Sequence, residues 1–130
     1  MPYDYRDDPR YQRIREVLTH ELDLPGHPRF YDLLAQMACM HADKNHDYAG
    51  DEDPLVNLRE CERFGISAVE GVIARITDKD SRFRNWFLKR NLVVRDESIL
   101  DTLLDRAVYT LLLMILAEEE LGVYDGCHLI

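Results

Sequence analysis

The amino-acid sequence predicts an all-α fold, a helical bundle of about five helices with short loops. In each long segment, apolar residues recur at intervals of three and four, the spacing that places them on one face of a helix. N-cap residues precede these segments, and Gly or Pro follows them. The apolar stretch Leu92-Val93-Val94 is too short and isolated to imply a sheet.

The first two helices are separated by a clear break. Asp8-Pro9 supplies an N-cap and a first helical residue, and an amphipathic helix follows to about Leu22. Residues 24–28, Leu-Pro-Gly-His-Pro, interrupt it. The second helix is predicted from about Pro28 to Asn45. Its expected buried stripe consists of Phe30, Leu33, Leu34, Met37 and Met40 or His41.

The next two helices also carry start and stop signals. A third, shorter helix is predicted to begin at Asp53-Pro54, the same Asp-Pro pair that begins the first helix, and to end at Gly65. Its expected apolar face is Leu55, Leu58, Cys61 and Phe64. Ser67 and Glu70 form a capping box that begins the fourth helix. The core candidates on the fourth helix are Val69, Val72, Ile73, Ile76, Phe83, Trp86 and Phe87.

The fifth helix has the strongest apolar character. It is predicted to start near Asp96-Glu97, where acidic side chains suit the helix dipole, and to stop at Gly122. Residues 109–117 are apolar on almost every side of the helix. This predicts burial in the bundle or in an oligomer interface, and we expect a dimer or a larger homo-oligomer.

Length and composition predict a single globular domain over residues 1–130, with residues 1–8 and 123–130 as tails. Of the 130 residues, 46% are hydrophobic and 32% charged, and no apolar run is long enough for a membrane span. The N-terminal residues lack the apolar core of a signal peptide, so we expect a cytoplasmic protein. A net charge of −9 opposes direct nucleic-acid binding but is compatible with a polyphosphate bridged by divalent cations.

Three polar groups stand out from an ordinary bundle. The first lies at the end of the second helix, where His41, Lys44 and Tyr48 recur at helical spacing beside His46 and Asp47. It offers a cation and ring donors to a ligand. The alternative is an exposed helix end, where Lys and His are favoured by the dipole.

The second group is on the fourth helix, where Arg75, Asp78 and Arg82 share nearly one face and Lys79 lies beside them. Two arginines at this spacing are suited to forked contacts with phosphate. A ladder of surface ion pairs is an equal alternative.

The third group is Glu97, Asp101 and Asp105, which recur every four residues on the fifth helix, with Tyr109 one step further. Like charges at this spacing are destabilising unless a cation neutralises them. Mg²⁺ is one such cation, because it is commonly held by one or two carboxylates with phosphates and waters. Arg82 is the other, since an antiparallel pairing of the two helices would bring it near Asp101 or Asp105.

Together these motifs resemble the nucleotide modification associated domain 1 family of phages and bacteria, over about residues 30–118. The stretches that carry the resemblance are residues 44–50 (Lys-Asn-His-Asp-Tyr-Ala-Gly), Asn57, residues 71–82 (Gly-Val-Ile-Ala-Arg-Ile-Thr-Asp-Lys-Asp-Ser-Arg) and residues 96–109 (Asp-Glu-Ser-Ile-Leu-Asp-Thr-Leu-Leu-Asp-Arg-Ala-Val-Tyr). That family is similar to the all-α nucleoside triphosphate pyrophosphohydrolases, which hold Mg²⁺ with carboxylates of two neighbouring helices. The three-glutamate cluster of those enzymes has no clean counterpart here.

The resemblance implies Mg²⁺-dependent hydrolysis of a (deoxy)nucleoside triphosphate to a monophosphate and pyrophosphate, in a bacterial or phage-infected cell. Glu97 and Asp101 would be catalytic and would hold metal together with Asp78 and Asp105. Lys44, Arg75, Lys79 and Arg82 would meet phosphate, and Asp47 or Tyr48 the base or sugar. The missing cluster keeps two alternatives open, a non-catalytic nucleotide-binding accessory module and a purely structural helical oligomer.

Overall fold

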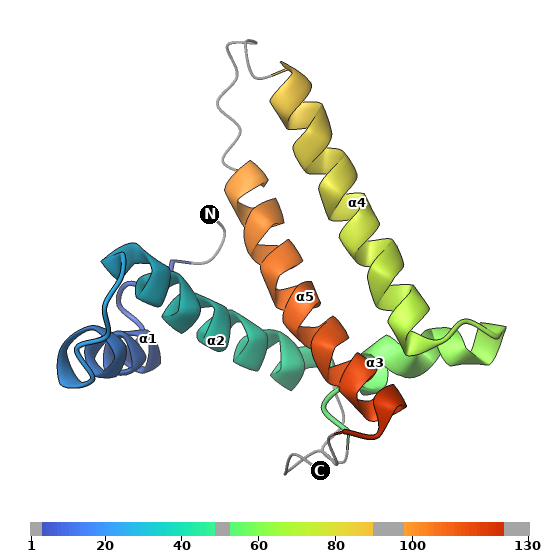
Figure 1. The fold of residues 1–130 in the computed structure, drawn as a ribbon, viewed down its shortest axis with the longest axis horizontal. Helices are drawn as coiled ribbons and strands as arrows, with labels where there is room; N and C mark the ends of the chain where they lie inside the picture. The colour runs from blue at the N-terminus through green and yellow to red at the C-terminus, as the bar shows by residue number, and fades with distance from the viewer. Residues whose placement is uncertain (1–3, 49–52, 90–97, 124–130) are drawn as a thin grey trace. The chain divides into compact units, whose positions relative to one another are not determined.

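The computed structural model describes residues 4–48, 53–89 and 98–123 (Figure 1). Across these ranges the chain forms five α-helices and no strand, which confirms the all-α prediction. None of these helices is long and apolar enough to cross a membrane. The elements in chain order are α1 (Pro9–Glu16), the π-helical turn η1 (Val17–Glu21), α2 (Pro28–Tyr48), α3 (Val56–Arg59), the 3-10 turn η2 (Glu60–Phe64), α4 (Ala68–Lys89) and α5 (Ser98–Leu121).

The helices group into two compact units, residues 1–54 and residues 55–130. The sequence predicted one domain without an internal division. The first unit contains α1, η1 and α2, and the second contains α3, η2, α4 and α5.

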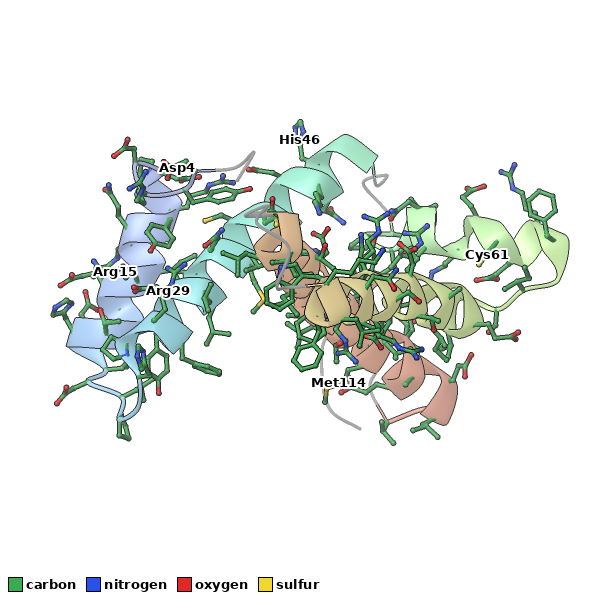
Figure 2. All side chains as sticks on the ribbon, turned by 90° about the horizontal axis from the view of Figure 1, so that it is seen from above. Asp4, Arg15, Arg29, His46, Cys61 and Met114 are labelled. Carbon is green, nitrogen blue, oxygen red and sulfur yellow. The ribbon has the colours of Figure 1, made fainter. Side chains whose placement is uncertain are left out.

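In the first unit, α1 packs against α2. Asp8 caps α1 as predicted, because its carboxylate accepts a hydrogen bond from the backbone amide of Arg10 at 2.8 Å. Arg15, labelled in Figure 2, links the two helices through an ion pair with Asp32 at 2.8 Å. The side chains buried in this unit are Tyr5, Tyr11, Ala35, Gln36, Cys39 and Met40. Burial raises the pKa of the Cys39 thiol.

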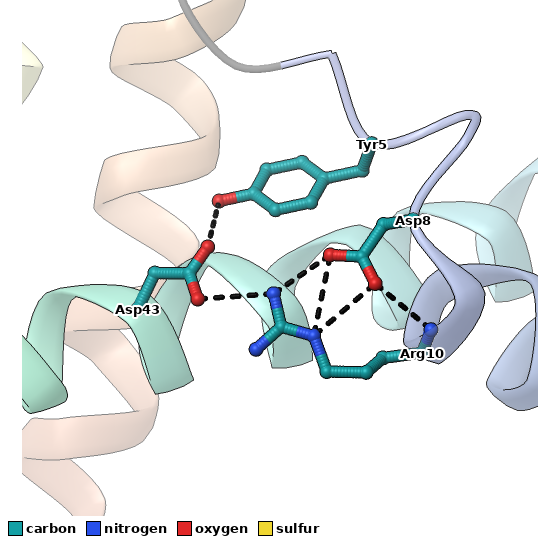
Figure 3. Close-up of polar contacts among 4 residues, drawn as sticks. All are labelled: Tyr5, Asp8, Arg10 and Asp43. Atoms are coloured by element: carbon teal, nitrogen blue, oxygen red, sulfur yellow. Dashed lines mark hydrogen bonds and ion pairs between the residues drawn. The ribbon is translucent and has the colours of Figure 1, made fainter.

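A polar cluster ties the chain before α1 to the C-terminal half of α2 (Figure 3). The Arg10 guanidinium lies between two carboxylates, 2.7 Å from Asp8 and 3.0 Å from Asp43. The hydrogen bond with Arg10 lowers the pKa of the Asp8 carboxyl. The hydroxyl of Tyr5 donates to Asp43 at 3.3 Å, and the ring of Tyr5 is buried. Residues 5–8, which we expected to be a tail, therefore include side chains that hold the first unit together.

The second unit begins with a helix that is shorter than predicted. Pro54 lies in a turn, and α3 starts only at Val56. From Glu60 the chain tightens into η2, as helices often do near their C-termini. Gly65 ends this segment in the left-handed conformation, with φ 76°, as the sequence predicted. Phe64 is 82% exposed and was wrongly expected on the apolar face, because the 3-10 turn changes the helical phase of the residues after Arg59.

Helices α4 and α5 form an antiparallel pair that makes up most of the second unit (Figure 1). The hydroxyl of Ser67 accepts from the amide of Glu70 at 3.1 Å, which confirms the predicted start of α4. Gly122, with φ 68°, ends α5 at the predicted residue. The predicted start of α5 at Asp96-Glu97 lies outside the described residues. The buried side chains of this unit are Leu55, Leu58, Ala68, Val72, Ile99, Thr102, Val108, Leu112 and Leu116.

Several predicted core positions are exposed. On α2, Phe30 is 60% exposed, whereas Ala35 and Cys39 are almost fully buried, so the buried stripe is rotated from the one expected. On α4, Ile73 and Phe87 are each nearly half exposed. Periodicity alone predicts an apolar face, but the packing partner decides which edge of that face is covered.

Gly71 allows η2 to approach α4 closely. A Cβ atom at this position would lie 2.8 Å from Sγ of Cys61, which is itself within 3.5 Å of the carbonyl oxygens of Leu58 and Ser67. The thiol has little room to move, because it lies between these backbone groups.

We therefore expect Gly71→Ala to destabilise the protein by about 1–3 kcal/mol through overpacking. In a Cys61→Ala background the same change should gain about 0.5–1 kcal/mol, because alanine is the better helix former. Urea denaturation of the four variants measures this coupling. If Gly71→Ala were stabilising in the wild-type background, the close approach would not exist in solution.

Candidate functional site

A shallow groove with a volume of about 420 Å³ lies between α4 and α5. The side chains that line it are Ala74, Arg75, Asp78, Lys79 and Tyr109. We call it the α4–α5 groove. Three of these residues, Arg75, Asp78 and Lys79, belong to the second polar group predicted from the sequence. The antiparallel pairing places the C-terminal part of the third group, Asp105 and Tyr109, across from them.

Arg75 and Tyr109 form the aromatic end of the groove. The central carbon of the Arg75 guanidinium lies 5.8 Å from the centre of the Tyr109 ring, within the range of a cation–π interaction. Arg75 is exposed and Tyr109 is half-buried, so the guanidinium can still donate hydrogen bonds outward. The pair presents a cation and a flat apolar ring side by side.

Lys79 and Asp105 form the second contact across the groove. Nζ of Lys79 lies 3.5 Å from Oδ2 of Asp105, and their side chains are only 16% and 25% exposed. Partial burial strengthens such a pair relative to one at the open surface. The sequence left Mg²⁺ and Arg82 as alternative cations near Asp101 or Asp105, whereas the basic side chain found beside Asp105 is Lys79.

Arg82 instead pairs within its own helix. Its Nε lies 3.3 Å from Oδ2 of Asp78, four residues earlier, and both side chains are more than half exposed. In this arrangement Asp78 is neutralised by a neighbour on α4. Both groups are well solvated, so either is free to exchange this partner for a ligand at little cost.

Asp101 lies one helical turn before Asp105 on α5. Its side chain is half-buried, and it has neither a hydrogen bond nor an ion pair in the part of the chain that the structure describes. A carboxylate that is half-buried without a cationic partner is an available ligand for a cation.

The other four predicted residues lie in the first unit or outside the part of the chain that the structure describes. Lys44 lies on α2 in the first unit. Asp47 and Tyr48 end the same helix, and their side chains are outside the described part of the structure. Glu97 also falls outside the described residues. These four predictions remain predictions.

The structure gives Tyr109 a place in the groove that its position in the third group did not specify, and it adds one further contact between the helices. Tyr109 is a wall of the groove, and its spacing of four residues from Asp105 was the available signal. Arg106 pairs with Asp80 at 2.5 Å. This pair joins the same two helices and is a structural contact that no motif indicated.

Within the described residues, no three His, Cys, Asp or Glu side chains come together in an arrangement that would hold a metal ion. Mg²⁺ does not require such a cluster, because substrate phosphates and waters complete its octahedron. The donors suited to it here are the Asp101 and Asp78 carboxylates. Asp78 lines the groove together with Lys79 and Arg75, whose cationic groups can bind phosphate oxygens, whereas Asp101 is not among the lining residues.

Comparison with protein-family models, curated proteins and solved structures finds no match to this chain.

The contact between Lys79 and Asp105 is testable by a double-mutant cycle of Lys79→Met and Asp105→Asn. We expect a coupling free energy of about 0.5–1 kcal/mol in urea denaturation, since the pair is only partly desolvated. The coupling should weaken as salt is added. A coupling energy of zero at low salt would show that the two side chains do not pair in solution.

Proposed function

We propose that the α4–α5 groove binds a nucleoside phosphate. The supporting observation is that Arg75, Lys79 and Tyr109 line one groove, in which the Arg75 guanidinium lies 5.8 Å from the centre of the Tyr109 ring. Guanidinium and ammonium groups bind phosphate oxygens, and an aromatic ring offers a stacking surface for a base. In this arrangement Lys79 and Arg75 contact the phosphates, and the base packs beside Tyr109.

The further step in this proposal is that the bound nucleotide is a (deoxy)nucleoside triphosphate held with Mg²⁺. Asp101 supports it, because this carboxylate is half-buried and has no partner in the described residues. Asp78 lies in the groove wall and would be released from Arg82 when that arginine turns to phosphate. When bound, Mg²⁺ polarises the phosphoryl group and lowers the pKa of a bound water.

On this basis we propose a pyrophosphohydrolase-like protein, in line with its resemblance to the nucleotide modification associated domain 1 family. Water adds to a phosphorus atom of the triphosphate, the bond to the pyrophosphate leaving group breaks, and a monophosphate remains. Glu97 and Asp101 are the proposed catalytic carboxylates, with Lys44, Asp47 and Tyr48 as further substrate contacts.

A non-catalytic nucleotide-binding module is the second candidate. Asp105, one of the proposed metal ligands, is paired with Lys79 across the groove. This contact removes a carboxylate from the small set that the chain offers to a metal. Binding without turnover would suit an accessory role in a nucleotide-modification pathway.

Binding is tested by titrating the purified protein with nucleotides and Mg²⁺ in a calorimeter. We expect Arg75→Gln and Tyr109→Leu each to weaken binding at least about tenfold, equivalent to about 1.4 kcal/mol. Arg84→Gln is the matched control, since Arg84 is an exposed arginine on α4 that does not line the groove. Equal weakening by Arg84→Gln would show that only overall charge matters, and the groove would not be the site.

Turnover is tested separately, with a panel of canonical and modified deoxynucleoside triphosphates and Mg²⁺, by anion-exchange separation of the products. We expect one substrate to yield equal amounts of monophosphate and pyrophosphate. Asp101→Asn should abolish this reaction while circular dichroism shows the same helix content. Binding without product across the panel would contradict hydrolysis and leave the accessory module as the function.

A further inference from the structure

Two contacts cross the α4–α5 groove, and they differ in chemistry. At one, the guanidinium carbon of Arg75 lies 5.8 Å from the centre of the Tyr109 ring. At the other, Nζ of Lys79 lies 3.5 Å from Oδ2 of Asp105. The second contact is four residues from the first on each helix, in opposite chain directions, as the antiparallel pairing requires (Figure 1). One helical turn, about 5.4 Å, therefore separates the two contacts along the groove.

The side chains that line the groove divide between these two positions. Arg75 and Tyr109 meet at the first, and Ala74 directly precedes Arg75 on α4. We call Ala74, Arg75 and Tyr109 the ring end. Asp78 and Lys79 lie one turn further along α4, and we call them the charged end. All five residues belong to the second unit, so the walls of the groove are complete within it.

The ring end has the chemistry to receive a nucleobase. Tyr109 presents a half-buried aromatic ring, and Ala74 adds a methyl group to the same wall. The flat faces of bases stack on aromatic side chains, and this contact contributes to affinity for every base. A phosphate group gains nothing from a ring or a methyl group. The ring end can therefore distinguish a nucleotide from a polyphosphate that has no base.

Ala74 keeps space open beside the Tyr109 ring. It has the smallest side chain of the five that line the groove. Its position on α4 is exposed, and an exposed helix position accepts leucine, glutamate or lysine almost as well as alanine. Helix formation therefore does not require a small residue here. The main consequence of the alanine is the room that it leaves at the ring end.

A longer side chain at position 74 would fill the ring end without entering the charged end. Side chains on an α-helix lean toward the N-terminus of the helix. Lys79 lies on the C-terminal side of position 74. A leucine at position 74 would therefore extend away from Lys79, and the phosphate contacts of the charged end would remain available.

We propose that Ala74 is a specificity-determining residue of the α4–α5 groove. By leaving the ring end open, it lets a base pack on Tyr109, and so the groove prefers a nucleoside triphosphate to an inorganic polyphosphate. This inference rests on the proposed function, since it takes the groove to bind phosphate. It assigns the discrimination to a side chain that has no polar group and cannot itself hold phosphate or metal.

The preference is measured by calorimetric titration of the full chain in the presence of Mg²⁺. The two ligands are inorganic tripolyphosphate and the deoxynucleoside triphosphate that the wild type binds most tightly. We expect the wild type to bind the nucleotide at least about tenfold more tightly than tripolyphosphate. Ala74→Leu should weaken nucleotide binding at least about tenfold, because steric discrimination in a pocket is commonly of this size. Its affinity for tripolyphosphate should change by less than about twofold, since no phosphate contact is altered.

Two further variants separate the size of residue 74 from other effects. Ala74→Ser restores a small side chain and should restore the preference for the nucleotide. Ser81→Leu adds similar bulk two turns further along the same side of α4, at an exposed position that does not line the groove. It should leave both affinities unchanged. Circular dichroism checks that each variant keeps its helix content.

The possible results distinguish this inference from the proposed function. A wild type that binds tripolyphosphate as tightly as the nucleotide overturns the inference, whereas the phosphate site stands. A wild type that binds neither ligand overturns the proposed function and this inference with it. If Ala74→Leu keeps the preference, or weakens both ligands equally, Ala74 does not determine specificity.

Discussion

The antiparallel packing of α4 against α5 decides where every polar side chain of the candidate site lies. Two ion pairs join these helices, Lys79 to Asp105 and Asp80 to Arg106, and a third joins Arg59 of α3 to Glu119 of α5. Val72 is almost completely buried on α4, and the buried Leu112 and Leu116 lie on α5. If the register slipped by one helical turn, Arg75 would lose Tyr109 and the groove would lose its aromatic wall.

The same packing gives an acidic protein a local surface suited to anions. The chain carries a net charge of −9, yet Arg75 and Lys79 come together on one wall of the groove. The three nearby carboxylates differ in their ion-pair partners. Asp105 is paired across the groove, Asp78 is paired along its helix, and Asp101 has no partner in the described residues. The chemistry of the groove depends on this division, because only unpaired or easily released carboxylates are available to a cation.

Helix α5 serves two surfaces at once. One face packs on α4, where Tyr109 lines the groove and Asp105 contacts Lys79, and the opposite face exposes Leu100, Leu111 and Met114. The helix is therefore apolar on two opposite sides, and only one of them packs against α4.

Much of the secondary structure was determined by the sequence itself, because caps act over a few residues. Asp8, Ser67, Gly65 and Gly122 start or end their helices at the positions that their chemistry predicts. Residues near a cap satisfy backbone groups of the same turn, so no distant contact is needed. The grouping of Arg75, Asp78 and Lys79 was also predicted from the local sequence, since helical spacing alone places these side chains close together.

Only the tertiary structure decided which residues meet across helices. It paired Asp105 with Lys79, where the sequence had left Mg²⁺ and Arg82 as alternatives for Asp101 or Asp105. It also brought Tyr109 beside Arg75 and left Phe64 and Phe30 exposed. The division into two compact units was likewise invisible in the pattern of helix signals. Register between helices follows from how side chains interlock over the whole contact, and no short stretch of sequence contains that information.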